Sequence, residues 1–264
     1  MSKILSSISG RKVGLDHNQK LLSQKGFTIG DHGDQNTLAG VKDVVIFDDF
    51  LDGFNTSRWL ATEGTDSATS AAAILAGGIG GILRLTTGDA GTGYAADAEQ
   101  ITQNDKFWQA SNGRLVLQTR LKLSAITTCY AFIGFTDNTA LEAPITSAAS
   151  ADTLTTNATD AVGFMFDTRM TNDTWWLVGV DTDVDATAQN TTYAPVADTW
   201  ATFRVELDTS GNATFFYNGI QVGTRMADAL APAADLTPVI TVSKTSVAAS
   251  MTADIDYIHV GMAR

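Results

Sequence analysis

Three aspartates at alternate positions are the first residues whose types and spacing could hold a metal ion. Asp181, Asp183 and Asp185 are spaced as in the first half of a calcium-binding loop, where every second residue supplies an oxygen ligand. The sixth position of that loop requires glycine but holds Ala186, and the twelfth requires a bidentate glutamate but holds Thr192. These departures exclude an EF-hand. They leave two alternatives, a surface Ca²⁺ site or, as we favour, a solvated acidic loop.

Two adjacent tryptophans, Trp175 and Trp176, are the residues best suited to stack on a sugar ring. Neighbouring residues of a strand point to opposite faces, so at most one of the two rings can be exposed. Packing in the core is the alternative reading for both rings, and we favour it.

Other residues that often carry chemistry lack the required spacing. The histidines are far apart in sequence, at His17, His32 and His259, and the chain has no nucleophile elbow, phosphate-binding loop or zinc pattern. We therefore expect no cofactor. The single cysteine, Cys129, lies in an apolar run, which predicts a buried structural thiol and excludes an intrachain disulfide.

The elements that must position these residues are strands. Residues 200–224 predict a strand, a turn, a second strand, a tight turn and a third strand. The first strand places Phe203, Val205 and Leu207 on one face and Arg204, Glu206 and Asp208 on the other. Asn218 and Gly219 close the second turn, because both tolerate the positive φ of a type I′ hairpin.

The same alternation recurs along the chain. Residues 113–123 place leucines on one face and mostly polar residues on the other. Further strands are expected at 44–50, 82–86, 129–136, 160–169, 173–181, 236–243 and 251–261. Residues 140–160 are rich in Ala, Thr and Ser and predict a long loop. The chain is therefore predicted to be all-β, a two-sheet antiparallel sandwich.

Two parts of the chain differ in the sign of their net charge. Residues 1–42 carry six basic and three acidic side chains, whereas residues 43–264 carry 11 basic and 26 acidic ones. The first part has too little apolar surface to fold alone, so we expect an extended N-terminal arm at 1–42 and one domain at 43–264. An ordinary solvated tail is the alternative for this arm. The acidic domain would repel nucleic acid.

Neither secretion nor membrane insertion is expected. The N-terminus has no apolar core of a signal peptide. The most apolar tract, residues 70–83, is too short and too rich in Gly and Ala to cross a bilayer.

Four segments carry a resemblance to a known family. FDDFLDGFNTSRW (47–59) resembles the opening of laminarinase-type glycoside hydrolases, and GRLVLQTRLKL (113–123) resembles one of their alternating strands. Residues 200–224 are similar to their Tyr-x-Gly hairpin, and ASMTADIDYIHVGMAR (249–264) is similar to their closing strand. The order of these segments implies the concanavalin A-like lectin and glucanase superfamily, and hence a jelly roll.

The resemblance also implies which side chains an enzyme of this type would need. Such enzymes carry Glu-x-Asp-x-x-Glu on one strand, because retaining hydrolysis needs two carboxyl groups about 5 Å apart. Between residues 130 and 180 the only glutamate is Glu142, in a loop-like context, and Asp167 stands alone between Phe166 and Thr168. We therefore expect that the chain is not an enzyme.

The function that these observations favour is structural. The acidic domain, the basic arm and a composition similar to that of phage structural proteins predict a bacteriophage capsid decoration or head-fibre protein, made in the host cytoplasm and located on the virion surface. Its expected partners are the major capsid protein or other virion proteins, and it is expected to form a homo-oligomer. The residues expected to contact the capsid are Lys3, Arg11, Lys12, Lys20 and Lys25.

Two other functions stay open at this point. The first is a carbohydrate-binding module or receptor-binding fibre component, with a glycan as partner and an exposed tryptophan as its platform. The second is an active glycosidase with diverged acids, for which Asp167 is the candidate.

Overall fold

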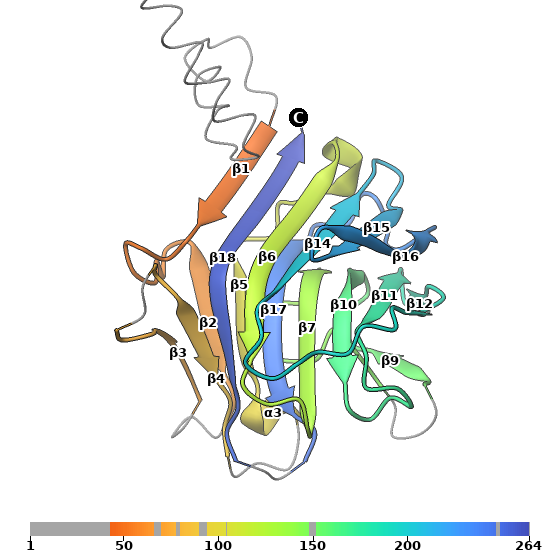
Figure 1. The fold of residues 1–264 in the computed structure, drawn as a ribbon. Coiled ribbons are helices and arrows are strands. Elements are labelled where there is room, and N and C mark those ends of the chain that lie inside the picture. Colours follow the sequence, from red (N-terminus) through yellow and green to blue (C-terminus); the bar gives the residue numbers. More distant parts are fainter. Residues whose placement is uncertain are drawn as a thin grey trace, which may run out of the picture. The chain divides into compact units, whose positions relative to one another are not determined.

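The structure is a computed structural model that describes residues 43–65, 70–77, 80–89, 94–103, 105–147, 152–246 and 249–263 (Figure 1). Residues 1–42 lie outside the described residues, and with them the five basic residues expected to contact a capsid. The arm and its boundary at residue 42 therefore stay predictions.

The regular elements of the described residues are almost all strands. The elements are β1 (Asp43–Asp48), β2 (Trp59–Glu63), β3 (Ala71–Ile74), β4 (Leu83–Thr86), α3 (Tyr94–Asp97), β5 (Glu99–Gln103), η2 (Ala110–Asn112), β6 (Leu115–Leu123), β7 (Cys129–Thr136), β8 (Ile145–Ser147), β9 (Leu154–Thr156), β10 (Ala161–Asp167), β11 (Trp176–Asp181), β12 (Val184–Asp185), β13 (Gln189–Asn190), β14 (Ala201–Leu207), β15 (Ala213–Tyr217), β16 (Ile220–Met226), β17 (Thr237–Lys244) and β18 (Thr252–Ala263).

These strands form two large antiparallel sheets, which confirms the predicted jelly-roll sandwich. Sheet A has the order β16-β15-β14-β6-β18-β4-β3, and β1 also pairs with β18. Sheet B has the order β12-β11-β10-β7-β17-β5-β2, and β13 also pairs with β11. Strands β6 and β18 run side by side along the middle of sheet A (Figure 1).

The core lies between the two sheets. Phe164 of β10 in sheet B contacts Phe203 of β14 and Phe215 of β15 in sheet A, with ring centroids 5.2 and 5.4 Å apart. Every second residue of β6 from Leu115 to Leu123 is buried, as the leucine alternation predicts. Alternation therefore sets the inward face of each strand, because the inward positions are where apolar side chains leave water.

Two local predictions have different outcomes. The hairpin between β15 and β16 is confirmed, since Asn218 and Gly219 take φ values of 51° and 79° in its turn. The long loop expected at 140–160 is wrong in part, because β8 and β9 pair with each other within it. Cys129 is buried, as expected.

A buried carboxylate joins three strands of sheet A. Asp254 of β18 lies opposite Arg84 of β4 and Lys122 of β6 in the strand register. Its oxygens accept hydrogen bonds from Arg84 Nε and Nη2 at 2.7 and 2.9 Å, and Lys122 Nζ is 3.4 Å away. Burial alone would raise the pKa of Asp254, but these two cations lower it below its ordinary value.

We expect Asp254→Ala to lower the free energy of unfolding by about 3 kcal/mol, because it leaves two partly buried cations without their common partner. The matched control is Asp256→Ala, which breaks a more exposed pair with Arg120 and should cost less than about 1 kcal/mol. Urea denaturation at neutral pH measures both values. Equal losses for the two variants would contradict this account.

A second buried carboxylate has no hydrogen-bond donor beside it among the described residues. The side chain of Glu99 in β5 is fully buried, and neither of its oxygens has a hydrogen-bond partner among the described residues. Burial, together with the Glu63 carboxylate opposite it on β2, raises the pKa of Glu99 to about 8.

The raised pKa predicts that stability falls with rising pH. The unfolded chain ionises Glu99 near pH 4.5, whereas the folded chain keeps it protonated up to about pH 8, so the free energy of unfolding decreases between these limits. Glu99→Gln should flatten this decrease, because glutamine does not titrate. Denaturation at a series of pH values measures the slope, and an unchanged slope in the variant would show that other groups cause it.

Candidate functional site

The three predicted metal-binding aspartates lie at a tight turn and do not converge. Asp181 ends β11, Asp185 ends β12, and Thr182 and Asp183 between these strands take φ values of 50° and 63°. Among the described residues, no group of three His, Cys, Asp or Glu side chains could hold a metal ion. The Ca²⁺ alternative therefore has no support in the geometry.

The two tryptophans point to opposite faces, as the strand geometry predicts, but neither offers an open ring face. Trp175 is 2% exposed and lies in the core, with its ring 4.6 Å from that of Phe203. Trp176 is 8% exposed and belongs to a hydrophobic cluster on the outward face of sheet B, the face turned away from sheet A. This placement agrees with packing against other side chains, the reading that we favoured for both rings, and stacking of either ring face on a sugar has no support in the geometry.

The outward face of sheet B, the one turned away from sheet A, is closed by the chain itself. Ala143, Ile145 and Ala158, from the segment that contains β8 and β9, pack on apolar residues of β7, β10, β11 and β17. The hydroxyl of Tyr130 donates to the carbonyl oxygen of Ile145 at 2.6 Å and holds this segment in place. The segment therefore covers the middle of this face.

The outward positions of β10 carry Asp167, the candidate acid of a diverged glycosidase. Ala161 and Met165 of β10 lie in the outward cluster, and Asp167 follows at the same period of two. The side-chain oxygens of Asp167 accept hydrogen bonds from Arg169 Nε at 2.9 Å, Arg169 Nη2 at 2.7 Å and the Ser147 backbone N–H at 3.0 Å. Asp167 thus anchors β8 to the end of β10. Glu142 lies in an exposed turn, where Asn138 approaches it at 3.5 Å.

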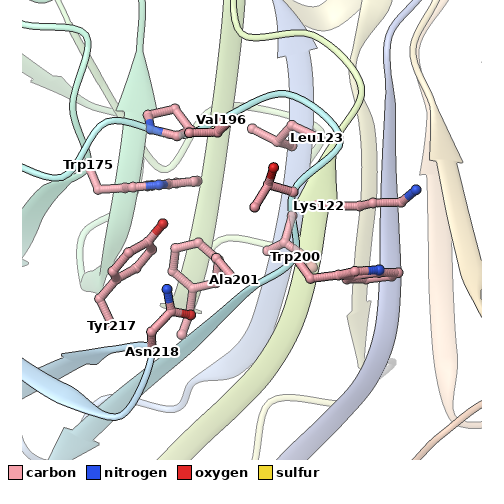
Figure 2. Close-up of a pocket in the computed structure, with 12 residues that line it drawn as sticks. Lys122, Leu123, Trp175, Val196, Trp200, Ala201, Tyr217 and Asn218 are labelled. Atoms are coloured by element: carbon pink, nitrogen blue, oxygen red, sulfur yellow. The ribbon is translucent and has the colours of Figure 1, made fainter.

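A pocket lies at one end of the sandwich, away from every residue that the sequence suggested except Trp175. It opens between the end of β6, the segment that leads into β14 and the turn between β15 and β16. In Figure 2, Trp175 and Tyr217 lie on one side of the pocket, and Lys122 and Trp200 lie on the other. The cavity has a volume of about 50 Å³.

The floor of the pocket is continuous with the core. Trp175 contacts Phe203, and Phe203 contacts Tyr217 with ring centroids 5.4 Å apart. The indole N–H of Trp175 is buried and has no hydrogen-bond partner among the described residues. A buried donor without an acceptor is costly, so this N–H would gain from a ligand oxygen.

The rim of the pocket is aromatic and apolar. Tyr193 is 42% exposed, and its ring lies 5.2 Å from that of Tyr217. Val196 is 62% exposed. Trp200 is half-buried, and the Arg120 guanidinium and the Lys122 ammonium lie 4.8 and 5.4 Å from its ring centroid. The rim therefore presents aromatic surface to a ligand, part of which is already in contact with cations.

The polar groups of the pocket are donors at neutral pH. Burial, with the neighbouring Tyr193, raises the pKa of the Tyr217 hydroxyl, which keeps its proton. The side-chain oxygen of Asn218 accepts a hydrogen bond from the backbone N–H of Thr202 at 2.8 Å. This bond fixes the orientation of the Asn218 amide group. Lys122 is paired with Asp254, so its positive charge is balanced within the protein.

Sequence reasoning missed most of this site. Tyr217 and Asn218 were interpreted only as parts of a hairpin, and Trp200 only as the start of a strand. The one available signal was the density of aromatic residues between 193 and 217. Their convergence with Lys122 and Trp175 depends on strand pairing across both sheets.

Comparison with known proteins supports the fold. No protein-family model and no curated protein matches the sequence. Among solved structures, the chain is similar to a β-glucanase of Bacillus licheniformis, with 11% identity, a TM-score of 0.54 and coverage of 82% of this chain and 97% of the glucanase. A prokaryotic β-1,3-1,4-glucanase from a mouse hindgut metagenome matches with 13% identity, a TM-score of 0.56 and coverage of 82% and 98%.

A binding domain also shares this fold. The carbohydrate recognition domain of Emp47p matches with 9% identity, a TM-score of 0.56 and coverage of 83% of this chain and 95% of that domain. The described residues therefore adopt the jelly roll of concanavalin A-like glucanases and lectin domains.

These neighbours correct one expectation. We expected from the absence of paired glutamates that the chain is not an enzyme, but most of its structural neighbours are glycoside hydrolases. That expectation is overturned, because the chain shares its fold, over about four fifths of its length, with glycoside hydrolases. At these low identities the likeness establishes the fold, and the function must be argued from the site.

Proposed function

We propose that this chain is a glycan-binding jelly-roll protein and that the pocket at the end of its sandwich is the binding site. The observation that carries the proposal is the convergence of ring faces and fixed donors at one opening. Trp200 and Tyr217 line the pocket and supply rings, and Asn218 supplies the amide. Tyr193 adds a ring beside the pocket, 5.2 Å from that of Tyr217.

Such a combination suits a sugar because a pyranose ring has both apolar C–H faces and hydroxyl groups. The C–H faces pack on aromatic rings, and the hydroxyls bond to a few fixed polar groups. The neighbours support the same class of ligand, since they include a carbohydrate recognition domain and several glucanases.

We expect Trp200→Ala to weaken glycan binding about five- to thirtyfold, because it removes the half-buried ring at the rim, and a rim ring of this kind is worth roughly 1–2 kcal/mol. A glycan array identifies the ligands, and calorimetric titration measures their affinities. Phe107→Ala is the matched control, since Phe107 is equally an aromatic residue at the surface but does not line the pocket.

Two results would contradict this prediction. An array on which the wild-type chain binds no glycan would refute the proposal. Equal affinities for Trp200→Ala and the wild type would place binding elsewhere on the molecule.

Because most neighbours cleave glycans, the release of reducing ends from each bound glycan belongs to the same experiment. Turnover that Asp167→Asn abolishes would place hydrolysis on the outward face of sheet B.

We propose as a second function that the chain is a virion structural protein, a capsid decoration or head-fibre protein attached through residues 1–42. The observation that favours it is the charge contrast, because residues 1–42 have a net charge of +3 and the rest of the chain has a net charge of −15. An acidic partner surface, such as a capsid shell, would attract the arm and repel the domain. The two functions are compatible in a virion protein that binds glycans.

We expect deletion of residues 1–42 to leave a folded domain that no longer sediments with virus particles. A variant with alanine at Lys3, Arg11, Lys12, Lys20 and Lys25 should lose most of the binding as well, and added salt should weaken the wild type, because exposed charges are screened. Circular dichroism confirms that both variants are folded. Full binding by the truncated chain would refute anchoring by the arm.

A further inference from the structure

We infer that the pocket accepts the acetamido group of an N-acetylated sugar, with the sugar ring itself on the aromatic rim. The inference rests on the proposed glycan binding and specifies which glycans are bound. It starts from the size of the cavity.

The cavity is too small for a sugar ring but large enough for one substituent. A water-sized group needs roughly 10–15 Å³ of cavity volume. The pocket has about 50 Å³ and so holds about four such groups. An acetamido group has four non-hydrogen atoms: a nitrogen, a carbon, an oxygen and a methyl. The pyranose ring that carries it would remain outside, against Trp200 and Tyr193.

The lining matches the two ends of this substituent. Leu121, Leu123, Val196 and Phe203 supply apolar surface, which suits a methyl group better than a hydroxyl. The buried indole N–H of Trp175 lacks an acceptor among the described residues, and a carbonyl oxygen is an acceptor without a competing donor.

The amide N–H of the acetamido group also has a suitable hydrogen-bond acceptor in the pocket. Tyr217 lines the pocket, and its hydroxyl oxygen can accept the N–H of the acetamido group. A hydroxymethyl group, the most common alternative substituent, has neither a methyl end nor an amide N–H.

Charge favours a neutral substituent over an acidic one. Lys122 is the cation that lines the pocket, and Asp254 balances it at 3.4 Å. The surrounding domain is strongly acidic, so the carboxylate of an acidic sugar would be repelled. An acetamido group avoids this cost because it carries no charge.

The test compares two trisaccharides that differ only at the position in question. Calorimetric titration of the full chain uses triacetylchitotriose and cellotriose, which carry an acetamido group and a hydroxyl at the same ring carbon. We expect at least about tenfold tighter binding of triacetylchitotriose, as two additional hydrogen bonds in a buried pocket provide. Unacetylated chitotriose should bind no better than cellotriose.

Adjacent tryptophans provide matched variants. Trp175→Phe removes the indole N–H and keeps an aromatic ring, and it should reduce the preference for triacetylchitotriose by about tenfold. Trp176→Phe should leave the preference unchanged, because the Trp176 ring lies in the outward cluster and its N–H donates to the Asn172 carbonyl oxygen at 3.3 Å. Thermal unfolding checks that both variants are folded.

The outcomes separate this inference from the proposed function. Equal affinity of the wild type for the two trisaccharides would overturn the acetamido assignment, whatever other glycans an array detects. A preference that survives intact in folded Trp175→Phe would overturn the role of the indole N–H. An array with no bound glycan at all would refute the proposed function itself.

Discussion

The packing of the two inward sheet faces is the constraint on which the rest of the structure depends. Phe164 of sheet B fits against Phe203 and Phe215 of sheet A, and these rings exclude water from the space between the sheets. Inward positions are therefore mostly apolar, and most charged groups lie on the outward faces and at the ends. Asp254 and its two cations obey this rule on the outward side of sheet A, where strand register brings residues from three distant parts of the chain into one ion pair.

The same packing explains where a ligand can bind. The segment around β8 and β9 closes the middle of the outward face of sheet B with an apolar cluster. At the end of the sandwich the core reaches the surface, because Phe203 contacts both buried Trp175 and half-exposed Tyr217. In the proposed function, residues of the pocket therefore serve stability and recognition together. At the buried rings Trp175 and Phe203 only conservative changes separate the two roles, since loss of a whole ring there would leave a cavity in the core.

The likeness to glucanases and lectin domains extends over most of the chain at identities of 9–13%. Such similarity is maintained by the period-two pattern of burial, which many sequences satisfy, and it leaves the outward faces free to change. That freedom explains why hydrolases and binding domains share the backbone. It also explains why the absence of a glutamate pair from one strand is a poor guide to activity.

The sequence by itself determined the fold class, because alternation in residues such as Leu115, Leu117 and Leu121 fixes which face of a strand is buried, and Asn218-Gly219 fixes a hairpin. It also determined that Trp175 and Trp176 point to opposite sides, since that follows from strand geometry alone. The tertiary structure decided that both rings are buried, that the described residues around β8 and β9 pack on a sheet, and that Lys122, Trp175, Trp200 and Tyr217 surround one pocket. These outcomes depend on contacts between residues far apart in the chain, and no local pattern specifies which distant side chains will meet.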